Sequence, residues 1–330
     1  MPDFANLLSS QNHRLAMPVL TFPGASLCGA TTRQMVTDSA AQAAAVGALH
    51  RRYRLPVVLS AMDLSAEAEA FGCAVQFSDH EVPTVLGRLV TDRAAAERFP
   101  VPAPGAARTR VYLDTVRRLQ DLPGRPPVFG GMVGPFSLAA RLYGVSEALG
   151  LTIEDPDLTH LLLEKTTAFL TAYAQAFKAA GASGVIMAEP TAGLLSPRAL
   201  ATFSSAYIRR IVTAADGPEF TVIVHNCGAR LVHLPQILES QARVFHFGAP
   251  MDLPAALAKA PSSVVLCGNL DPSKVFVQSS PDEVATATRS LLAVTAGYRN
   301  HVLSSGCDIP PQTPLANLDA FFEATRDAGL

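Results

Sequence analysis

The chain has 330 residues, of which 49% are hydrophobic and 16% are charged, and its formal net charge is -2. This composition can build a large core and gives no electrostatic reason to expect nucleic acid as a partner. No apolar run approaches the roughly 18 residues of a membrane span, and the first twenty residues lack the pattern of a signal peptide. We therefore expect a cytoplasmic protein without a membrane partner, with residues 1–330 forming a single domain.

Eight short apolar runs of strand length recur along the chain, separated by Ala- and Leu-rich stretches of helical length. The predicted strands are Met17–Pro23, Pro56–Met62, Pro127–Val133, Gly184–Ala188, Val222–Gly228, Arg243–Phe247, Val264–Gly268 and Val302–Asp308. Eight buried strands that alternate with helices predict an α/β protein of the (β/α)8 TIM-barrel class.

The stretches between the strands have the spacing and the caps of helices. Asp38 or Ser39 can serve as the N-cap of the first one, and proline stands near the start of several others. The predicted helices are Ser39–Arg52, Pro135–Leu149, Asp157–Ala180, Ser196–Ala214, Pro281–Gly297 and one that starts at Thr313-Pro314 and continues through Phe322.

The connection after the second predicted strand is too long for a simple crossover. About 60 residues, 64–126, separate Asp63 from Pro127. A long excursion from a barrel loop is often a lid or part of the substrate wall, and the alternative is a surface insertion without a role.

Two of the predicted strands end in residues that bind soft metals. His225 and Cys227 stand two positions apart at one strand end, and Cys307 stands at the end of another strand. The chemistry of TIM barrels lies at the carboxyl ends of the strands, so these three side chains are expected to meet at the barrel mouth. Two thiolates and one imidazole suit Zn²⁺, and three protein ligands leave the fourth position open, as in a catalytic site.

The same residues carry a resemblance to a known family. The motifs His-x-Cys-Gly at 225–228, Gly-Asn-Leu-Asp-Pro at 268–272 and Gly-Cys-Asp-Ile-Pro at 306–310 resemble the methylcobamide:coenzyme M methyltransferases. That group belongs to the uroporphyrinogen decarboxylase superfamily of (β/α)8 barrels, and the likeness extends over most of the chain. The resemblance implies that His225, Cys227 and Cys307 are zinc ligands.

The decarboxylases of the superfamily provide the main alternative. They need no metal, and they hold substrate carboxylates with an arginine-rich loop after the first strand. Here the corresponding residues 21–29 contain no arginine, and the first one is Arg33. This departure disfavours a decarboxylase that binds a tetrapyrrole with many carboxylates.

The implied chemistry is the activation of a thiol. At the open position of zinc, a thiol loses its proton and becomes nucleophilic. The resemblance then implies attack on the methyl group of a methylcorrinoid, which a separate carrier protein would supply because no Asp-x-His-x-x-Gly pattern is present. A small thiol such as coenzyme M is the expected acceptor, with homocysteine or tetrahydrofolate as alternatives. A barrel that only binds the carrier is the non-enzymatic alternative.

Further polar residues follow other predicted strands. Glu189 is a catalytic candidate that either occupies the fourth zinc position or accepts the thiol proton, unless it binds neighbouring backbone instead. Asp63 (catalytic) and Asn269 (cofactor-binding) are expected to orient substrate or ligands, with loop capping as the alternative. His246 either supports the site or is a core histidine. Cys28, Cys73 and Cys267 are expected to be buried thiols.

Overall fold

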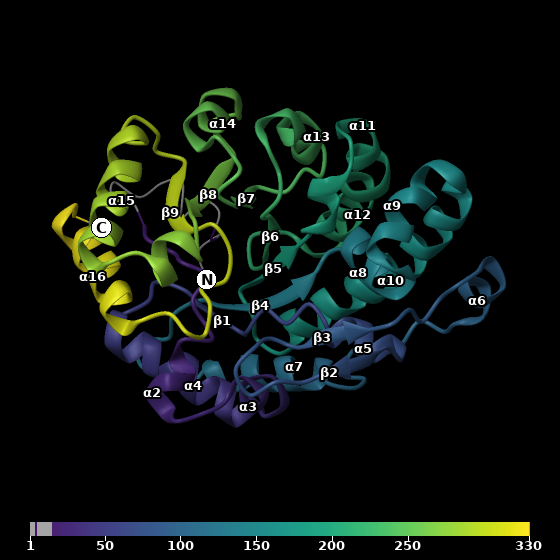
Figure 1. Cartoon of the computed structure of the whole chain (residues 1–330), viewed down its shortest axis with the longest axis horizontal. Coiled ribbons are helices and arrows are strands. Elements are labelled where there is room, and N and C mark those ends of the chain that lie inside the picture. Colours follow the sequence, from purple (N-terminus) through teal and green to yellow (C-terminus); the bar gives the residue numbers. More distant parts are fainter. Residues whose placement is uncertain (1–3, 5–14, 330) are drawn as a thin grey trace.

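The barrel is built from parallel strands that lie side by side in a curled sheet. Within Phe4 and residues 15–329, which this computed structural model describes, the sheet has seven strands in the order β1-β4-β5-β6-β7-β8-β9. Their bounds are β1 Val58–Leu59, β4 Val128–Val133, β5 Gly184–Ala188, β6 Thr221–Asn226, β7 Val244–Phe247, β8 Val265–Leu270 and β9 His301–Ser305. Helices surround the sheet in Figure 1.

The segment near Ala16 takes the remaining place in the barrel. Ala16 forms a parallel bridge to Leu303 of β9, and the backbone N–H of Met17 donates to the Leu303 carbonyl at 2.8 Å. The first predicted strand therefore lies in its expected place beside the last one, although it is not a regular strand. The predicted (β/α)8 architecture is confirmed. Most of the first twenty residues, on which the signal-peptide expectation rests, lie outside the described residues.

The strands are buried on both faces, which explains their continuous apolar sequences. Alternate residues, such as Ile186 and Ala188 of β5, point into the barrel, while Val185 and Met187 pack against the surrounding helices. The interior cluster also contains Cys267, which is fully buried, as predicted.

The helices largely follow the predicted pattern. Their bounds are α2 Gly24–Cys28, α3 Thr32–Thr37, α4 Ser39–Tyr53, α5 Ala66–Phe71, α6 Arg93–Arg98, α7 Thr109–Leu119, α8 Pro135–Tyr143, α9 Val145–Glu154, α10 Pro156–Ala179, α11 Pro197–Leu200, α12 Ala206–Ala215, α13 Leu234–Leu238, α14 Leu253–Lys259, α15 Pro281–Val294 and α16 Leu315–Asp327. Among these helices of the described chain, none is both long and apolar enough to cross a membrane.

Two predicted helices are interrupted. The one predicted over Pro135–Leu149 breaks at Gly144, whose φ of 104° is a conformation that glycine adopts readily. The one that begins near Ser196 contains a wider turn at Ala201–Ser205 between α11 and α12.

The excursion after β1 folds back onto the barrel. It contains α5, a hairpin of β2 (Ala74–Gln76) and β3 (Thr84–Leu86), α6 and α7. The hairpin lies near the barrel mouth in Figure 1, whereas α6 lies farther out, at the edge of the molecule, where it packs against α10. The loop between β2 and β3 lines the cavity that also contains His225, Cys227 and Cys307, so this part of the excursion lies where a substrate wall would lie, and that role stays a prediction.

Candidate metal centre

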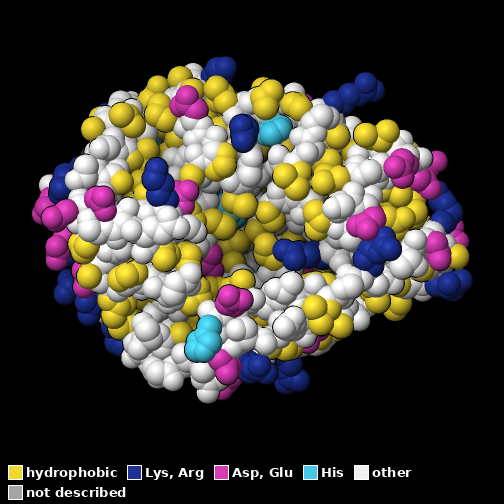
Figure 2. All heavy atoms as spheres, in the orientation of Figure 1, with side chains coloured by type: hydrophobic (Ala, Val, Ile, Leu, Met, Phe, Trp, Pro, Cys, Tyr) yellow, Lys and Arg dark blue, Asp and Glu magenta, His cyan; other side chains and the backbone are white. Residues whose placement is uncertain are grey.

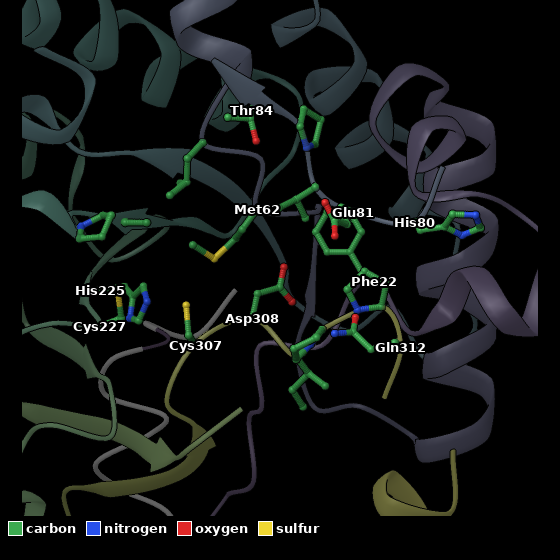
Figure 3. A pocket seen from close by; sticks show the side chains of 18 of the residues that line it. Phe22, Met62, His80, Glu81, Thr84, His225, Cys227, Cys307, Asp308 and Gln312 are labelled. Carbon is green, nitrogen blue, oxygen red and sulfur yellow. The ribbon is translucent and has the colours of Figure 1, made fainter. Parts of the chain in front are cut away.

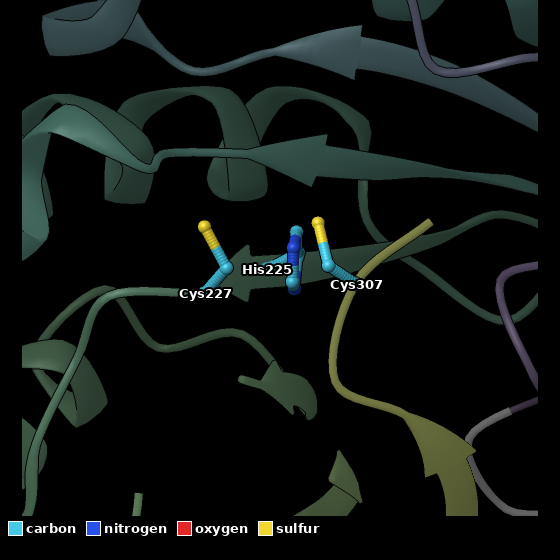
Figure 4. A group of neighbouring side chains, drawn as sticks. All are labelled: His225, Cys227 and Cys307. Atoms are coloured by element: carbon cyan, nitrogen blue, oxygen red, sulfur yellow. The ribbon is translucent and has the colours of Figure 1, made fainter. Parts of the chain in front are cut away.

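The three predicted metal ligands meet at one end of the barrel. His225 is the penultimate residue of β6, Cys227 follows the final residue of that strand, and Cys307 lies two residues beyond β9. One ligand atom from each residue lies within 4.8 Å of the others. Figure 4 shows the two sulfur atoms on either side of the His225 ring. Residues 80 positions apart are thus brought together because both strands end at the same face of the barrel.

A glycine allows the Cys227 loop its position. A Cβ atom on Gly248, which follows β7, would lie 2.1 Å from the carbonyl oxygen of Cys227 and 2.7 Å from its Cα. No side chain fits at such a distance, so the close approach of the two loops requires glycine.

Hydrogen bonds fix the tautomer of His225. Its Nδ1 lies 3.2 Å from the carbonyl oxygen of His246, which can only accept, so Nδ1 carries the proton. It also lies 2.8 Å from Nδ1 of His246. His246 Nε2 in turn lies 2.8 Å from the hydroxyl oxygen of Ser304, and that hydroxyl donates to the Met17 carbonyl at 2.6 Å. Each of these contacts has a donor and an acceptor when His225 Nδ1 carries the proton, and in the neutral imidazole Nε2 then bears a lone pair.

The Nε2 atom of His225 points toward the two thiols and makes no hydrogen bond of normal geometry to the described residues. His225 is 1% exposed, and its Nε2 is a buried polar atom without a hydrogen-bond partner among the described residues. An unpaired buried nitrogen costs free energy unless a ligand occupies its lone pair. Burial and the neighbouring His225 hold the pKa of His246 well below its usual range, so His246 stays neutral.

The two thiols interact with one another. A hydrogen bond from Cys307, helped by His225, lowers the pKa of Cys227 to about 4, although burial acts in the opposite direction. The same hydrogen bond, together with burial, raises the pKa of Cys307. The pair therefore offers one thiolate readily, and a bound cation would displace the second proton.

The donor set fits zinc. In a tetrahedral site with Zn–S bonds of about 2.3 Å, the sulfur atoms lie about 3.8 Å apart, so separations within 4.8 Å need only small side-chain rotations. The neutral imidazole, the two thiols and the open side toward the cavity match three protein ligands plus one exchangeable position. The second histidine, His246, supplies the outer contact that usually orients a metal-binding imidazole.

These residues form the end wall of a cavity of about 480 Å³. Figure 2 shows a hollow near the middle of this face with hydrophobic side chains in it, and Figure 3 shows the labelled lining residues around the space. Besides the three ligands, the lining consists of Phe22, Met62, Leu64, His80, Glu81, Val82, Pro83, Thr84, Arg141, Ala188, Pro190, Asp308, Ile309, Pro310, Pro311 and Gln312. The volume is that of a small-molecule site.

Glu189 lies apart from this group. Its two carboxylate oxygens accept hydrogen bonds from the backbone N–H groups of Phe136 (2.8 Å) and Ser137 (2.9 Å) at the start of α8, and the Ser204 hydroxyl donates at 3.0 Å. The residue is 1% exposed and does not line the cavity. These contacts match the alternative in which the carboxylate binds backbone, and a catalytic role of Glu189 stays a prediction without support from them.

Asp63 and Asn269 are also engaged by the protein. Asp63 accepts from Ser65 and Tyr112 and forms a buried ion pair with Arg108. Asn269 donates to the carbonyls of residues 248 and 251 at 3.0 and 2.7 Å. Neither residue lines the cavity, so their contacts match the loop-capping alternative, and the predicted roles toward substrate or cofactor gain no support.

Sequence reasoning missed three charged residues of the cavity, which are Glu81, Arg141 and Asp308. Asp308 follows Cys307 directly, accepts a hydrogen bond from Thr21 at 3.1 Å, and has a pKa that burial raises to about 8. Its place in the Gly-Cys-Asp motif was a usable signal, whereas Arg141 lies inside a helix and gave none. The prediction for Cys28 was wrong, because this thiol is exposed at the end of α2.

Comparison with known proteins agrees with this description. A family profile described as uroporphyrinogen decarboxylase (URO-D) matches residues 13–328, and the chain belongs to that family. A solved methyltransferase from Methanosarcina mazei has the same fold, with a TM-score of 0.89 and 22% identity over 99% of this chain and 98% of that one.

Curated relatives come from two branches. The chain is 28% identical to the methylcobamide:CoM methyltransferase MtbA of Methanosarcina acetivorans, over 80% of this chain and 78% of the relative. It is 29% identical to the uroporphyrinogen decarboxylase of Ectopseudomonas mendocina, over 84% of this chain and 80% of the relative. The predicted likeness to the methyltransferase branch is confirmed, and these relatives support the prediction that the chain is a methyltransferase.

Proposed function

We propose that the chain, acting as a single domain, is a zinc-dependent methyltransferase that moves a methyl group from a methylated corrinoid to a small thiol such as coenzyme M. The observation that carries the proposal is the unpaired, buried Nε2 of His225, which lies beside the thiols of Cys227 and Cys307 at the wall of a cavity. His225, Cys227 and Cys307 would hold the metal. Bound zinc would supply one function, which is to lower the pKa of an incoming thiol so that its sulfur is a thiolate.

The residues of the chain contribute position and exclusion of water. The His246–Ser304 hydrogen bonds orient the imidazole, and apolar side chains such as Phe22, Met62 and Ile309 surround the space where the thiol would lie. The cavity is too small to enclose a corrinoid together with its carrier. The donor would therefore present its methyl group at the barrel mouth, on a separate corrinoid protein.

The decarboxylase branch offers the second candidate function. The relatives named uroporphyrinogen decarboxylase are as similar as the methyltransferases. Two features of the cavity disfavour decarboxylation of a tetrapyrrole. One is the soft metal-binding group, and the other is the scarcity of cationic side chains, since Arg141 is the one Lys or Arg among the described lining residues. A substrate with many carboxylates would find few cations there. Methyl transfer to homocysteine or to tetrahydrofolate is a further alternative within the first reaction class.

Metal analysis combined with a transfer assay tests the proposal. We expect about one zinc per chain and transfer of the methyl group from methylcobalamin to 2-mercaptoethanesulfonate. Cys307→Ala should lose both while circular dichroism shows the fold retained. Unchanged transfer by this variant would refute the proposal, and a zinc-free protein that decarboxylates uroporphyrinogen would support the alternative.

A further inference from the structure

Arg141 is the one Lys or Arg among the described residues that line the cavity of the metal centre. It belongs to α8, which follows β4 and lies outside the three-residue metal group. The cavity thus contains a soft metal-binding wall, an apolar lining and a single guanidinium. Since His225, Cys227 and Cys307 would hold the metal, the guanidinium is available to bind another part of a small molecule in the cavity.

The guanidinium has no partner within the described protein. No hydrogen bond or ion pair joins it to any described residue, and its side chain is only partly exposed. Burial lowers the pKa of Arg141, and the nearby carboxylates of Asp63 and Glu67 act against this without contacting it. A partly desolvated arginine without a counter-ion is unfavourable, and an anionic ligand would relieve this cost.

Each of the two nearby acids has a contact elsewhere in the fold, although Glu67 Oε2 has no hydrogen-bond partner among the described residues. Asp63 is bound by Arg108, Tyr112 and Ser65, and one oxygen of Glu67 accepts from the backbone N–H of Val133 at 2.9 Å. These acids therefore hold other parts of the fold together and do not neutralise Arg141 by direct contact.

The helix that carries Arg141 is fixed at both ends. Glu189 binds the first N–H groups of α8, and the backbone N–H groups of Leu89 and Val90 donate to the carbonyl of Leu142 at 2.9 and 3.0 Å. A charged group on so constrained a helix loses little further freedom when it binds a ligand. The excursion after β1 contributes the second of these anchors.

The cavity also contains two acids. Asp308 is held by Thr21 and by backbone N–H groups, and Glu81 lies on the exposed loop between β2 and β3. A ligand with an acidic group would turn that group toward Arg141 and away from these residues. The apolar lining between them suits a short aliphatic linker.

We propose that Arg141 is the specificity-determining residue of this cavity, which binds the sulfonate or carboxylate of a small acidic thiol while the sulfur of that thiol faces His225, Cys227 and Cys307. The planar guanidinium donates two parallel hydrogen bonds to such a group. This inference rests on the proposed function for the thiol, but the anion site can be tested separately.

Calorimetric binding to the zinc-loaded protein provides the test. The probes are 2-mercaptoethanesulfonate, 3-mercaptopropionate, the neutral 2-mercaptoethanol, and ethanesulfonate, which has no thiol. We expect the acidic thiols to bind about 10- to 100-fold more tightly than 2-mercaptoethanol, the range given by a charge-assisted pair of hydrogen bonds. Arg141→Gln should abolish this preference and leave the affinity for 2-mercaptoethanol within about twofold of wild type.

Two further variants make the result specific. Arg141→Lys should retain part of the preference, because it keeps the charge but not the planar pair of donors. Arg198→Gln removes an exposed arginine of α11 that does not line the cavity, and it should behave like wild type. A preference that survives in Arg141→Gln, or that is absent from the wild type, overturns the inference.

The probe without a thiol separates the two proposals. If no thiol binds in a zinc-dependent manner but ethanesulfonate binds to the wild type and not to Arg141→Gln, the anion site stands and the thiol acceptor is wrong. If neither ethanesulfonate nor any acidic thiol binds, the anion site is wrong, and the thiol acceptor is wrong as well if 2-mercaptoethanol does not bind either.

Discussion

The support that His246 gives to His225 leads to a quantitative prediction. His246→Phe keeps an aromatic ring of similar size on β7 but removes the nitrogen that accepts from His225 Nδ1 at 2.8 Å. The carbonyl oxygen of residue 246 remains as a second acceptor at 3.2 Å. Loss of an outer contact to a metal-binding histidine usually lowers metal affinity 10- to 100-fold, and the remaining acceptor places this variant near the lower limit. We expect a loss of about tenfold, or about 1.4 kcal/mol.

Competition with a chromophoric zinc chelator measures this loss directly. The matched control is His301→Phe, because His301 is also a buried strand histidine but lies outside the metal group, with its Nε2 near the carbonyl of residue 268. This control should melt at a lower temperature without losing zinc affinity. Wild-type zinc affinity in His246→Phe would refute the reasoning, and so would an equal loss in the His301 variant.

The structure also predicts the direction of change in two other experiments, one on zinc affinity and one on the pH dependence of stability. Gly248→Ala would place a methyl group 2.1 Å from the Cys227 carbonyl oxygen, so the loop that carries Cys227 must move. Zinc affinity in the same competition assay should then fall by about tenfold or more. Gly297→Ala is the control, because open space surrounds this glycine, and it should leave zinc affinity unchanged. Burial raises the pKa of Glu67 from 4.5 to about 8, so between these pH values the folded protein retains a proton that the unfolded chain loses. The free energy of unfolding should therefore fall as pH rises from 4.5 to 8, by at most about 5 kcal/mol. Glu67→Gln, which can still accept from Val133, should flatten this dependence in thermal melts, and an unchanged slope would contradict the assignment.

The sequence was sufficient to predict the barrel and the convergence of His225, Cys227 and Cys307, for physical reasons. Strands buried on both faces must be apolar throughout, so β4 to β9 appear as apolar runs, and their carboxyl ends lie at one face. His225, Cys227 and Cys307 could therefore be assigned to one site without knowledge of the contacts. The segment near Ala16 and the two-residue β1 form less regular strands than predicted. An apolar sequence indicates that a segment is buried, but it does not determine how many hydrogen bonds that segment forms with its neighbours.

The remaining site residues depend on contacts that a sequence does not contain. A residue at the end of a strand can face the cavity or can turn back onto the adjacent helix, and both positions have the same spacing in the chain. Glu189 turns back onto the adjacent helix, because the first N–H groups of α8 donate hydrogen bonds to its carboxylate and the helix dipole favours a negative charge there. Arg141, in contrast, reaches the cavity from within a helix, a position that no strand-end argument identifies.

Unused hydrogen-bonding capacity distinguishes His225 and Arg141, which face the cavity, from Glu189, which does not. The carboxylate of Glu189 is occupied by two N–H groups and a hydroxyl, so a ligand would have to displace contacts that hold α8. His225 Nε2 and the guanidinium of Arg141 have no partner among the described residues, and both belong to residues of the same cavity. One is a lone pair suited to a soft cation, and the other is a planar donor suited to an anion. In the proposed complex, a ligand that combines a sulfur with an acidic group would use both, with its sulfur at the metal group and its acid at the arginine. Glu189 would then contribute only indirectly, since it anchors the helix from which Arg141 reaches the cavity.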